Sequence, residues 1–390
     1  MTIRRTAALA AAGLLLAIPA TGAAAELRTS TPRDDAAHTA ADIRTEWWFV
    51  NAVDPASGLA VAAAMGSRFP GMPPASVVFI YPPGGGTAST VGAPRLLTAP
   101  PSTTRADVRL GEDRIWAPSP GVLRVRVNLE RGLVFSGPSD GTVRVDLTYR
   151  STAPGFLAGP LRIPGGQWIS WTVDQPSARV SGTVEAGGRT YRLRDVPGYH
   201  DHNFGDFDLA DPAHGGWDWS QVHLPEGRSL VTGIVRPADG SRDGVSVLSG
   251  PGGRLGAARA RDVEIRRGDW ADVDGHVYPR RLEMRARLSG GWEARVRFTA
   301  RRALPLLFTR DGDSALVEIE ARTSGELLRD GRVVSRWPEA PAFYEYESTP
   351  VTRERDGAPG SITGLARAAL GAAAKLRNSL VPFSGDPRGD

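Results

Sequence analysis

The sequence predicts an all-β protein built from antiparallel strands. Short segments in which apolar and polar residues alternate recur along the chain, and such alternation marks strands with one buried face. Glycine and proline are frequent, at 46 and 31 of the 390 residues, and they separate these segments as turn residues do. Almost no stretch shows the 3.6-residue period of a helix. Barrels and sandwiches are the architectures open to such a chain.

The clearest alternating segments occur in both halves of the chain. They are LRVRVNL (123–129), TVRVDLTY (142–149), ARVSGTV (178–184), SLVTGIV (229–235), EARVRFTA (293–300) and ALVEIEARTSG (315–325). Successive side chains of a strand point to opposite faces, so we expect each segment to be half-buried.

A weak internal repeat predicts two domains of similar design. TEWWFVNAVDPASGLAVAA (45–63) and GWDWSQVHLPEGRSLVTGI (216–234) both contain closely spaced tryptophans, a strand, a turn with glycine and a second apolar strand. The length of the chain also suggests two domains. We therefore expect an N-terminal β-domain over residues 26–206 and a C-terminal β-domain over residues 207–352.

The first 25 residues have the pattern of an export signal. Arg4 and Arg5 precede an apolar run over residues 7–20, and small residues lead up to Glu26. The run is too short to span a bilayer. We expect residues 1–25 to be a signal peptide and the exported protein to be periplasmic or secreted.

The C-terminal tail, residues 353–390, contains the one long segment with a helical pattern. Its sequence SITGLARAALGAAAKLRNSL (361–380) begins with Ser361, a residue type suited to an N-cap. A short helix that packs on the second domain, an amphipathic helix that makes peripheral contact with a membrane and a segment without fixed structure all fit this pattern.

Missing residue types exclude several chemistries. The chain has no cysteine, which removes thiol catalysis, thiolate zinc sites and iron–sulfur clusters. Lys375, in the tail, is the single lysine, so a Schiff base, pyridoxal phosphate and P-loop phosphate binding find no lysine in the expected domains. The formal net charge is +4, and the arginines are interspersed with acids. A nucleic-acid partner needs a concentrated basic face, so we expect none.

Titratable and aromatic side chains crowd into YHDHNFG (199–205) and GGWDWSQVHLP (215–225). If the first of these segments is extended, Tyr199, Asp201 and Asn203 share one face of the strand, and His200 and His202 share the other. A carboxyl flanked by a phenol and an amide inside a barrel would be desolvated, which raises its pKa. Asp201 is therefore the first candidate for a general acid.

Two other interpretations of this segment stay open. Asp201 and the histidines can instead be structural, capping a turn and bonding to backbone groups at a domain junction. A metal site is the other interpretation, because His200 and His202 have the same-face spacing of a ligand pair that His214 or His223 would complete. The sequence shows no HExxH helix in support of a metal.

Five tryptophans that belong to three close pairs are candidates for contact with an apolar ligand. Aromatic faces line pockets and stabilise cations, although tryptophan is also ordinary core filling. Trp171 and Trp168 are the best candidates because their segment leads toward YHDHNFG. The further candidates are Trp48, Trp217 and Trp219.

Four blocks of sequence together resemble a known superfamily. They are TEWWF (45–49), WISWTVDQPSARVSGTVEAGGRTYRL (168–193), GYHDHNFG (198–205) and WDWSQVHLPEGRSLV (217–231). The resemblance is to the lipocalin-like superfamily of carotenoid 1,2-hydratases (hydroxyneurosporene synthases), kievitone hydratase-like proteins, β-barrel Diels–Alderases and AttH-type periplasmic proteins. It covers roughly residues 40–350.

This resemblance implies a tandem of two lipocalin-like (calycin) antiparallel β-barrel domains with an apolar cavity. It also implies reactions without a cofactor on hydrophobic, often isoprenoid or polyene, substrates. The aspartate of the tyrosine-x-aspartate pattern is the expected proton donor, which maps onto Asp201 with Tyr199 beside it. An upstream aromatic residue maps onto Trp171 or Trp168.

We therefore expect a cofactor-independent hydratase, a hydro-lyase, or a cyclase. Asp201 would protonate an alkene of a hydrophobic substrate, with Tyr199 beside it and with His200 and His202 as supports on the other face. Nearby aromatic faces would stabilise the cation until water or an internal alkene or hydroxyl captured it. Two alternatives stay open: an exported carrier of a lipid or isoprenoid that associates with a transporter, and a pericyclase whose cavity only holds a polyene in a reactive shape.

Overall fold

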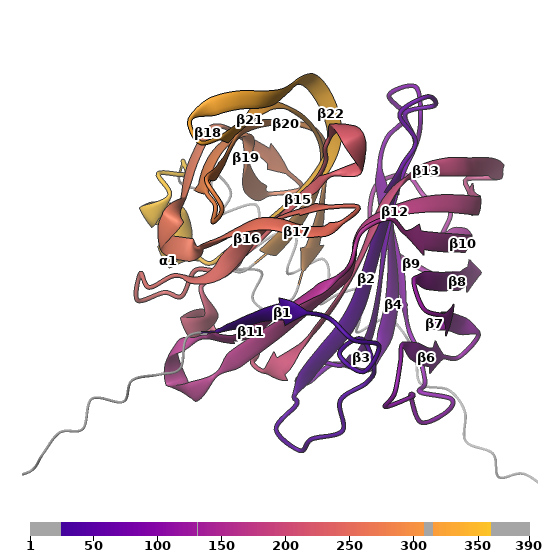
Figure 1. The fold of residues 1–390 in the computed structure, drawn as a ribbon. Coiled ribbons are helices and arrows are strands. Elements are labelled where there is room, and N and C mark those ends of the chain that lie inside the picture. The colour runs from indigo at the N-terminus through magenta and orange to yellow at the C-terminus, as the bar shows by residue number, and fades with distance from the viewer. Residues whose placement is uncertain (1–24, 131, 308–314, 360–390) are drawn as a thin grey trace, which may run out of the picture.

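The computed structural model describes residues 25–130, 132–307 and 315–359, and these form almost entirely antiparallel β-structure (Figure 1). Their strands belong to two sheets, one of thirteen strands and one of nine. The all-β prediction is confirmed. Within the described residues the one α-helix is α1 (Pro350–Arg355), which follows the last strand and begins with a capping box at Thr349.

The first sheet contains all strands up to residue 206. They are β1 (Glu26–Thr29), β2 (Thr45–Val53), β3 (Ala60–Arg68), β4 (Ala75–Tyr81), β5 (Ser89–Pro94), β6 (Asp107–Leu110), β7 (Asp113–Ser119), β8 (Val122–Glu130), β9 (Leu133–Ser136), β10 (Thr142–Ser151), β11 (Phe156–Arg162), β12 (Trp168–Ala186) and β13 (Arg189–Asp206). Their order is β6-β7-β8-β10-β12-β13-β2-β3-β4-β5-β9, and β11 joins β1 to β12. Strand β13 is therefore central, between β12 and β2.

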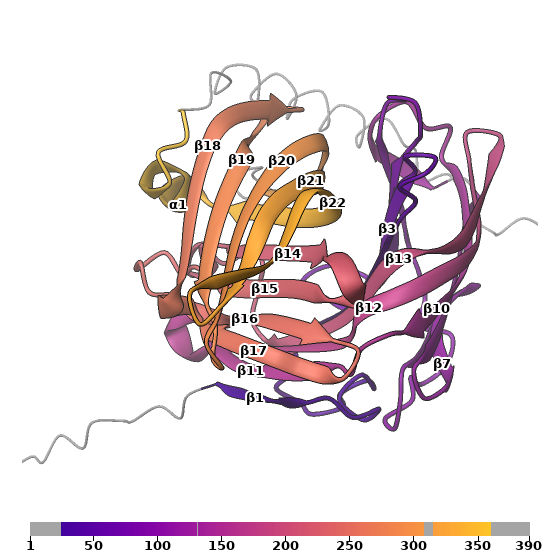
Figure 2. The same ribbon diagram turned by 45° about the horizontal axis from the view of Figure 1, so that its top comes forward.

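The second sheet contains the remaining strands. They are β14 (Trp217–His223), β15 (Ser229–Val235), β16 (Asp243–Gly250), β17 (Gly253–Arg259), β18 (Val263–Val273), β19 (His276–Arg287), β20 (Trp292–Leu307), β21 (Ala315–Arg329) and β22 (Arg332–Ser348). The order is β17-β16-β15-β14-β22-β21-β20-β19-β18, so the first strand pairs with the last. Figure 2 shows β18–β22 standing across the direction of β14–β17.

The strand pairing in the described part of the chain leaves both sheets open at their ends. Closed barrels therefore stay a prediction. The chain passes from one sheet to the other between Asp206 and Trp217. The domain limits drawn from the sequence also stay predictions.

Apolar side chains are buried in three main clusters, and the middle cluster joins the two sheets. The first cluster is formed by the first sheet alone and includes Trp48 and Val50. The third is formed by the second sheet alone and includes Tyr344. The middle cluster combines Trp171 of the first sheet with Trp219 and other residues of the second. The sheets thus pack against each other through a shared apolar interface.

Burial along the strands reflects this arrangement. Strands β8 and β10 alternate between buried and more exposed residues, as the sequence predicts. Strands β2 and β14 are buried on both faces, because each has its own core on one side and the other sheet on the other. The strands that carry the conspicuous motifs are therefore the ones enclosed between two cores.

Two expectations from the sequence fall on other parts of the chain. The export signal and the helix expected over residues 361–380 lie outside the described residues, apart from Ala25. Export, membrane contact and transporter association therefore stay predictions. No helix in the described part of the chain is long and apolar enough to cross a membrane.

Candidate functional site

A cavity of about 220 Å³ lies at the interface between the two sheets. Apolar side chains form most of its lining, among them Trp47, Phe49 and Trp171 from the first sheet and Trp217 and Trp219 from the second. Four polar side chains also line it: Asp201, Asn203, Glu318 and Glu345. The cavity is thus an apolar space into which three carboxyl groups project.

Strand β13 places Asp201 at this cavity through its register with β2. Asp201 lies opposite Phe49 and Asn203 lies opposite Trp47, and all four line the cavity. The intervening histidines lie opposite Trp48 and Val50, which belong to the first sheet's own core. The alternation is the one that the strand period predicts.

The expected location of Asp201 inside a barrel is corrected by this geometry. The residues of β13 that alternate with Asp201 lie on the face of the first sheet that packs against that sheet's own core. Asp201 lies on the opposite face, which meets the second sheet. Asp201 is buried because the second sheet covers this face.

Gly205 allows β13 to lie close to β12, because a Cβ at this position would lie 2.2 Å from the carbonyl oxygen of Trp168 on β12.

Three donors surround the Asp201 carboxyl. Trp171 Nε1 donates to Oδ2 at 2.9 Å and the Tyr199 hydroxyl donates to the same oxygen at 2.7 Å. Asn203 Nδ2 donates to Oδ1 at 3.0 Å. The side chain is 2% exposed, and burial raises the pKa of Asp201 to about 6, although the Trp171 and Tyr199 donors oppose the rise. Oδ2 accepts two hydrogen bonds and Oδ1 accepts one, so a proton on this carboxyl belongs on Oδ1.

Tyr199 connects Asp201 to the second sheet. Its hydroxyl accepts a hydrogen bond from Trp219 Nε1 at 3.3 Å and donates to Asp201. Burial and the nearby Asp201 carboxyl raise the pKa of Tyr199 well above its ordinary value. The phenol therefore stays protonated and acts as a fixed donor that holds Asp201 in place.

Glu318 and Glu345 are functional candidates that sequence reasoning missed. They lie directly opposite each other on the paired strands β21 and β22. Glu318 is fully buried, and Glu345 is partly exposed to the cavity. Burial raises the pKa of both carboxyls, and each carboxyl contributes to the shift of the other. The cavity therefore holds a carboxyl pair on the second sheet as well as Asp201 on the first.

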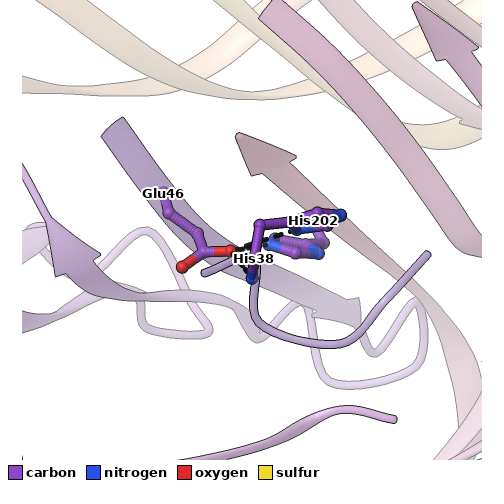
Figure 3. A group of neighbouring side chains, drawn as sticks. All are labelled: His38, Glu46 and His202. Atoms are coloured by element: carbon purple, nitrogen blue, oxygen red, sulfur yellow. Dashed lines mark hydrogen bonds and ion pairs between the residues drawn. The ribbon is translucent and has the colours of Figure 1, made fainter. Parts of the chain in front are cut away.

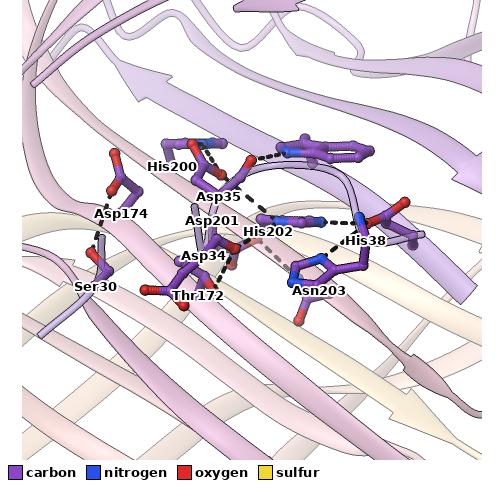
Figure 4. A network of polar contacts seen from close by, with 12 residues as sticks. Ser30, Asp34, Asp35, His38, Thr172, Asp174, His200, Asp201, His202 and Asn203 are labelled. Carbon is purple, nitrogen blue, oxygen red and sulfur yellow. Dashed lines mark hydrogen bonds and ion pairs between the residues drawn. The ribbon is translucent and has the colours of Figure 1, made fainter. Parts of the chain in front are cut away.

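His200 lies on the far side of β13 from the cavity and forms an ion pair (Figure 4). Its Nδ1 is 2.9 Å from the carbonyl oxygen of Phe49, and its Nε2 is 3.0 Å from Asp35 Oδ2. Burial alone would lower the pKa of His200, but the Asp35 carboxylate reverses this and raises it to about 9. Both ring nitrogens face acceptors, which favours the doubly protonated cation. His200 thus ties β13 to the segment before β2.

His202 belongs to the one group of described residues whose geometry suits a metal ion, with His38 and Glu46 (Figure 3). Glu46 Oε1 is 3.2 Å from both His38 Nδ1 and His202 Nε2. Glu46 also accepts hydrogen bonds from Ser67 Oγ and from the His38 backbone N–H. Burial would raise the pKa of Glu46, but the histidine hydrogen bonds lower it to about 2. Hydrogen bonding and ion pairing therefore account for this group, which lies behind β13 and does not line the cavity.

The histidines first considered as metal ligands do not come together as one set. His214 Nε2 bonds to Glu347 Oε2 at 3.0 Å. His223 is buried at the end of β14, and burial together with Arg179 lowers its pKa to about 3. His200 and His202 share a face, as expected. Asp35 lies 3.0 Å from His200 Nε2 and 3.9 Å from His202 Nδ1, and Glu46 lies 3.2 Å from His202 Nε2.

The tryptophan candidates divide by strand face. Trp171, Trp217 and Trp219 line the cavity, as expected. Trp48 does not, because its ring stacks on His202 and its Nε1 donates to the Asp35 carbonyl oxygen. Trp168 packs edge-on against Phe204 in a separate small cluster. Residues that are an odd number of positions apart on a strand point to opposite faces. Trp47 therefore lines the cavity and Trp48 does not, and Trp171 lines it and Trp168 does not.

Residues 31–340 match the sequence profile of a family described as Domain of unknown function (DUF7064). The chain belongs to the DUF7064 family. No curated protein matches the chain significantly.

This DUF7064 chain has the fold of the lipocalin-like superfamily, as the sequence resemblance predicts. An AttH-like protein from Nitrosomonas europaea is 20% identical with a TM-score of 0.56, over 83% of this chain and 97% of that one. Kievitone hydratase from Nectria haematococca is 15% identical with a TM-score of 0.52, over 78% and 89%. CghA, solved with Sch210972, is 13% identical with a TM-score of 0.51, over 83% and 98%. At these identities the likeness establishes the fold alone.

Proposed function

We propose that the protein is a cofactor-independent enzyme of the hydratase or cyclase type, in which Asp201 protonates an alkene of a hydrophobic substrate. The observation that carries this proposal is a buried carboxyl with a raised pKa inside an apolar cavity. A carboxylic acid that is neutral near working pH can deliver a proton, and tuning by burial is how enzymes obtain one.

The first step transfers the proton from Asp201 Oδ1 to an alkene carbon. The carboxylate that remains is stabilised by Trp171 Nε1 and the Tyr199 hydroxyl, which already point at Oδ2. The carbocation lies among the lining aromatics, and each aromatic face stabilises a cation by about 0.5 to 2 kcal/mol. Water captures the cation in a hydration, whereas an internal alkene or hydroxyl captures it in a cyclisation.

The size of the cavity limits the substrate. One water position requires about 10 to 15 Å³, so 220 Å³ corresponds to about 15 to 22 water-sized positions. A fifteen-carbon isoprenoid alcohol such as farnesol has this size and carries alkenes that give tertiary cations. A longer polyene would extend past Met72 and Phe135, lining residues that are 40% and 51% exposed.

Two of the structural neighbours support this proposal at the level of the fold. One is a hydratase by name, and the other was solved with a small molecule. A fold hosts many functions, so the residues in the cavity carry the argument for this chain.

Incubation with farnesol in D2O enriched in H2(18)O tests the proposal by mass spectrometry. We expect product with one deuterium on carbon, and with 18O as well where water captures the cation. Farnesol that binds but returns without deuterium would contradict an enzyme. That outcome, with an apolar molecule co-purifying with the protein, would indicate a carrier.

The rate should depend on pH through Asp201. The general acid must be protonated, so with a pKa of about 6 the turnover number should fall about tenfold per pH unit above that value. An aspartate with an ordinary pKa would lose its proton near pH 4. His200 and Asp35 behind the strand act in opposite directions on this pKa. A rate that stays constant or rises between pH 6 and 8 in a turnover assay would contradict Asp201 as the acid.

A further inference from the structure

We propose that Glu318 and Glu345 share one proton and form the base of the same reaction, taking the proton of the hydroxyl group or water that captures the cation. This inference rests on the proposed function and adds a second proton-transfer group to it. It also narrows the reaction class to addition of an O–H bond across an alkene.

Glu318 and Glu345 lie in the same cavity as Asp201 but on the other sheet. Glu345 lies opposite Trp219 on β14 and opposite Glu318 on β21, so these three residues form a row across adjacent strands. Trp219 bonds to Tyr199, which bonds to Asp201. All the carboxyls named line one cavity, with Asp201 on the first sheet and the pair on the second. A ligand between the sheets therefore meets an acid on one side and the carboxyl pair on the other.

The two carboxyls have no counter-charge among the described residues. Among the described residues no ion pair joins Glu318 or Glu345 to an arginine or histidine, and the other charged groups that act on them, Asp201 and Glu347, are also acids. Two adjacent buried carboxyls cannot both ionise without compensation, so one keeps a proton. We therefore assign the pair as one carboxyl hydrogen-bonded to one carboxylate.

Hydrogen bonds to the pair favour the negative charge on Glu345. Trp217 Nε1 donates to Glu345 Oε2 at 2.6 Å, which favours a negative charge on Glu345. Neither carboxyl oxygen of Glu318 receives a hydrogen bond from a donor group in the described residues. Glu318 therefore carries the shared proton and donates a hydrogen bond to Glu345. The charged member of the pair is the one that is partly exposed to the cavity.

The proton balance of the reaction closes with these groups. The π-electron pair of the alkene forms a C–H bond with the Asp201 proton, and a lone pair of the attacking oxygen forms the C–O bond. The proton of that oxygen passes to Glu345. Asp201 ends as a carboxylate and the pair ends with one additional proton, and exchange with water restores both. Nothing is oxidised or reduced.

The proposed pair and a purely structural carboxyl differ in the effect that Glu318→Gln should have on stability. Burial and Glu345 raise the pKa of Glu318 in the folded protein, so between its ordinary and its folded pKa the folded state binds more protons than the unfolded state, and stability falls as pH rises. Glu318→Gln removes this penalty and should raise the melting temperature more at pH 8 than at pH 5. A structural carboxyl would show a loss of stability instead.

Infrared spectroscopy tests the shared proton without any substrate. At pH 8, where Asp201 is ionised, the wild type should show the C=O band of a protonated carboxyl, and E318Q should lose this band while D201N keeps it. Absence of the band from the wild type, or its persistence in E318Q, would overturn the proposal. Glu283→Gln is the matched control, because Glu283 lies on β19 with its side chain 41% exposed.

Isotope uptake by farnesol from labelled water separates this inference from the proposed function. Deuterium on carbon reports the Asp201 step, and formation of the C–O bond reports the Glu345 step. We expect E345Q to retain deuterium uptake but to form the addition product at least a hundredfold more slowly. E345Q that forms this product at the wild-type rate would overturn the base assignment, whereas deuterium uptake by D201N would overturn the acid assignment.

Discussion

Replacing Asp201 with asparagine is expected to lower turnover by about 10²- to 10⁴-fold while leaving the fold and ligand binding intact. Asparagine has the shape of aspartate but no acidic proton. Its carbonyl oxygen can still accept from Trp171 Nε1 and the Tyr199 hydroxyl, and its amide faces Asn203, whose own amide can turn to accept. The variant therefore removes the proton and keeps the surrounding contacts.

Deuterium uptake into farnesol measures the loss, and quenching of tryptophan fluorescence by farnesol measures binding. The matched control is Asp195→Asn on the same strand. Asp195 is 71% exposed and has a φ of 57°, a conformation that asparagine also tolerates. Full turnover by D201N would refute Asp201 as the acid. A slowing of only about tenfold would favour a pericyclase, in which the cavity acts by holding a polyene in shape.

The sequence predicts the strand faces better than it predicts what covers them. The period of two separates Asp201 from His200 and His202, and the structure has that separation. Both faces of β13 are buried, however, so alternation alone does not tell which face meets the sheet's own core. Position 201 therefore faces the second sheet, where the sequence led us to expect the inside of a barrel.

The acids of the second sheet were missed for the same reason. In ALVEIEA (315–321) Glu318 has the position of a polar residue on a half-buried strand, and nothing local distinguishes it from an exposed one. The first sheet covers this face of β21 and turns a surface position into a fully buried one. Such burial depends on contacts between residues far apart in sequence, which a strand pattern does not contain. The acid between two tyrosines in YEYES (344–348) was the only local signal.

The arrangement of the site gives the two sheets a joint role. Asp201, Trp171 and Tyr199 come from the first sheet, and Trp219 and Glu345 come from the second. The hydrogen bonds from Trp219 to Tyr199 and from Tyr199 to Asp201 cross the interface. Neither sheet alone encloses the cavity or desolvates the acid, so packing between the sheets sets the pKa on which the chemistry depends.

Gly233 on β15 provides a test of this dependence, through Gly233→Ala. A Cβ at this position would lie 2.5 Å from Cζ3 of Trp171, which packs against the edge of Phe156. The added methyl group should displace the indole ring, weaken its hydrogen bond to Asp201 and lower turnover by about 10²-fold, the cost of roughly 1 Å of misplacement. Overpacking should also cost about 1 to 3 kcal/mol of stability.

The direction of the pH effect distinguishes this mechanism from general damage. The Trp171 hydrogen bond favours the ionised form of Asp201, so weakening it should raise the Asp201 pKa further and move the inflection of the rate profile above pH 6. Gly252→Ala is the matched control, because a Cβ at Gly252 meets nothing within 4 Å. A G233A enzyme that loses activity with an unchanged inflection would separate Trp171 from the tuning of the acid. A G233A enzyme that keeps both activity and inflection would show that turnover does not depend on the packing of Gly233 against Trp171.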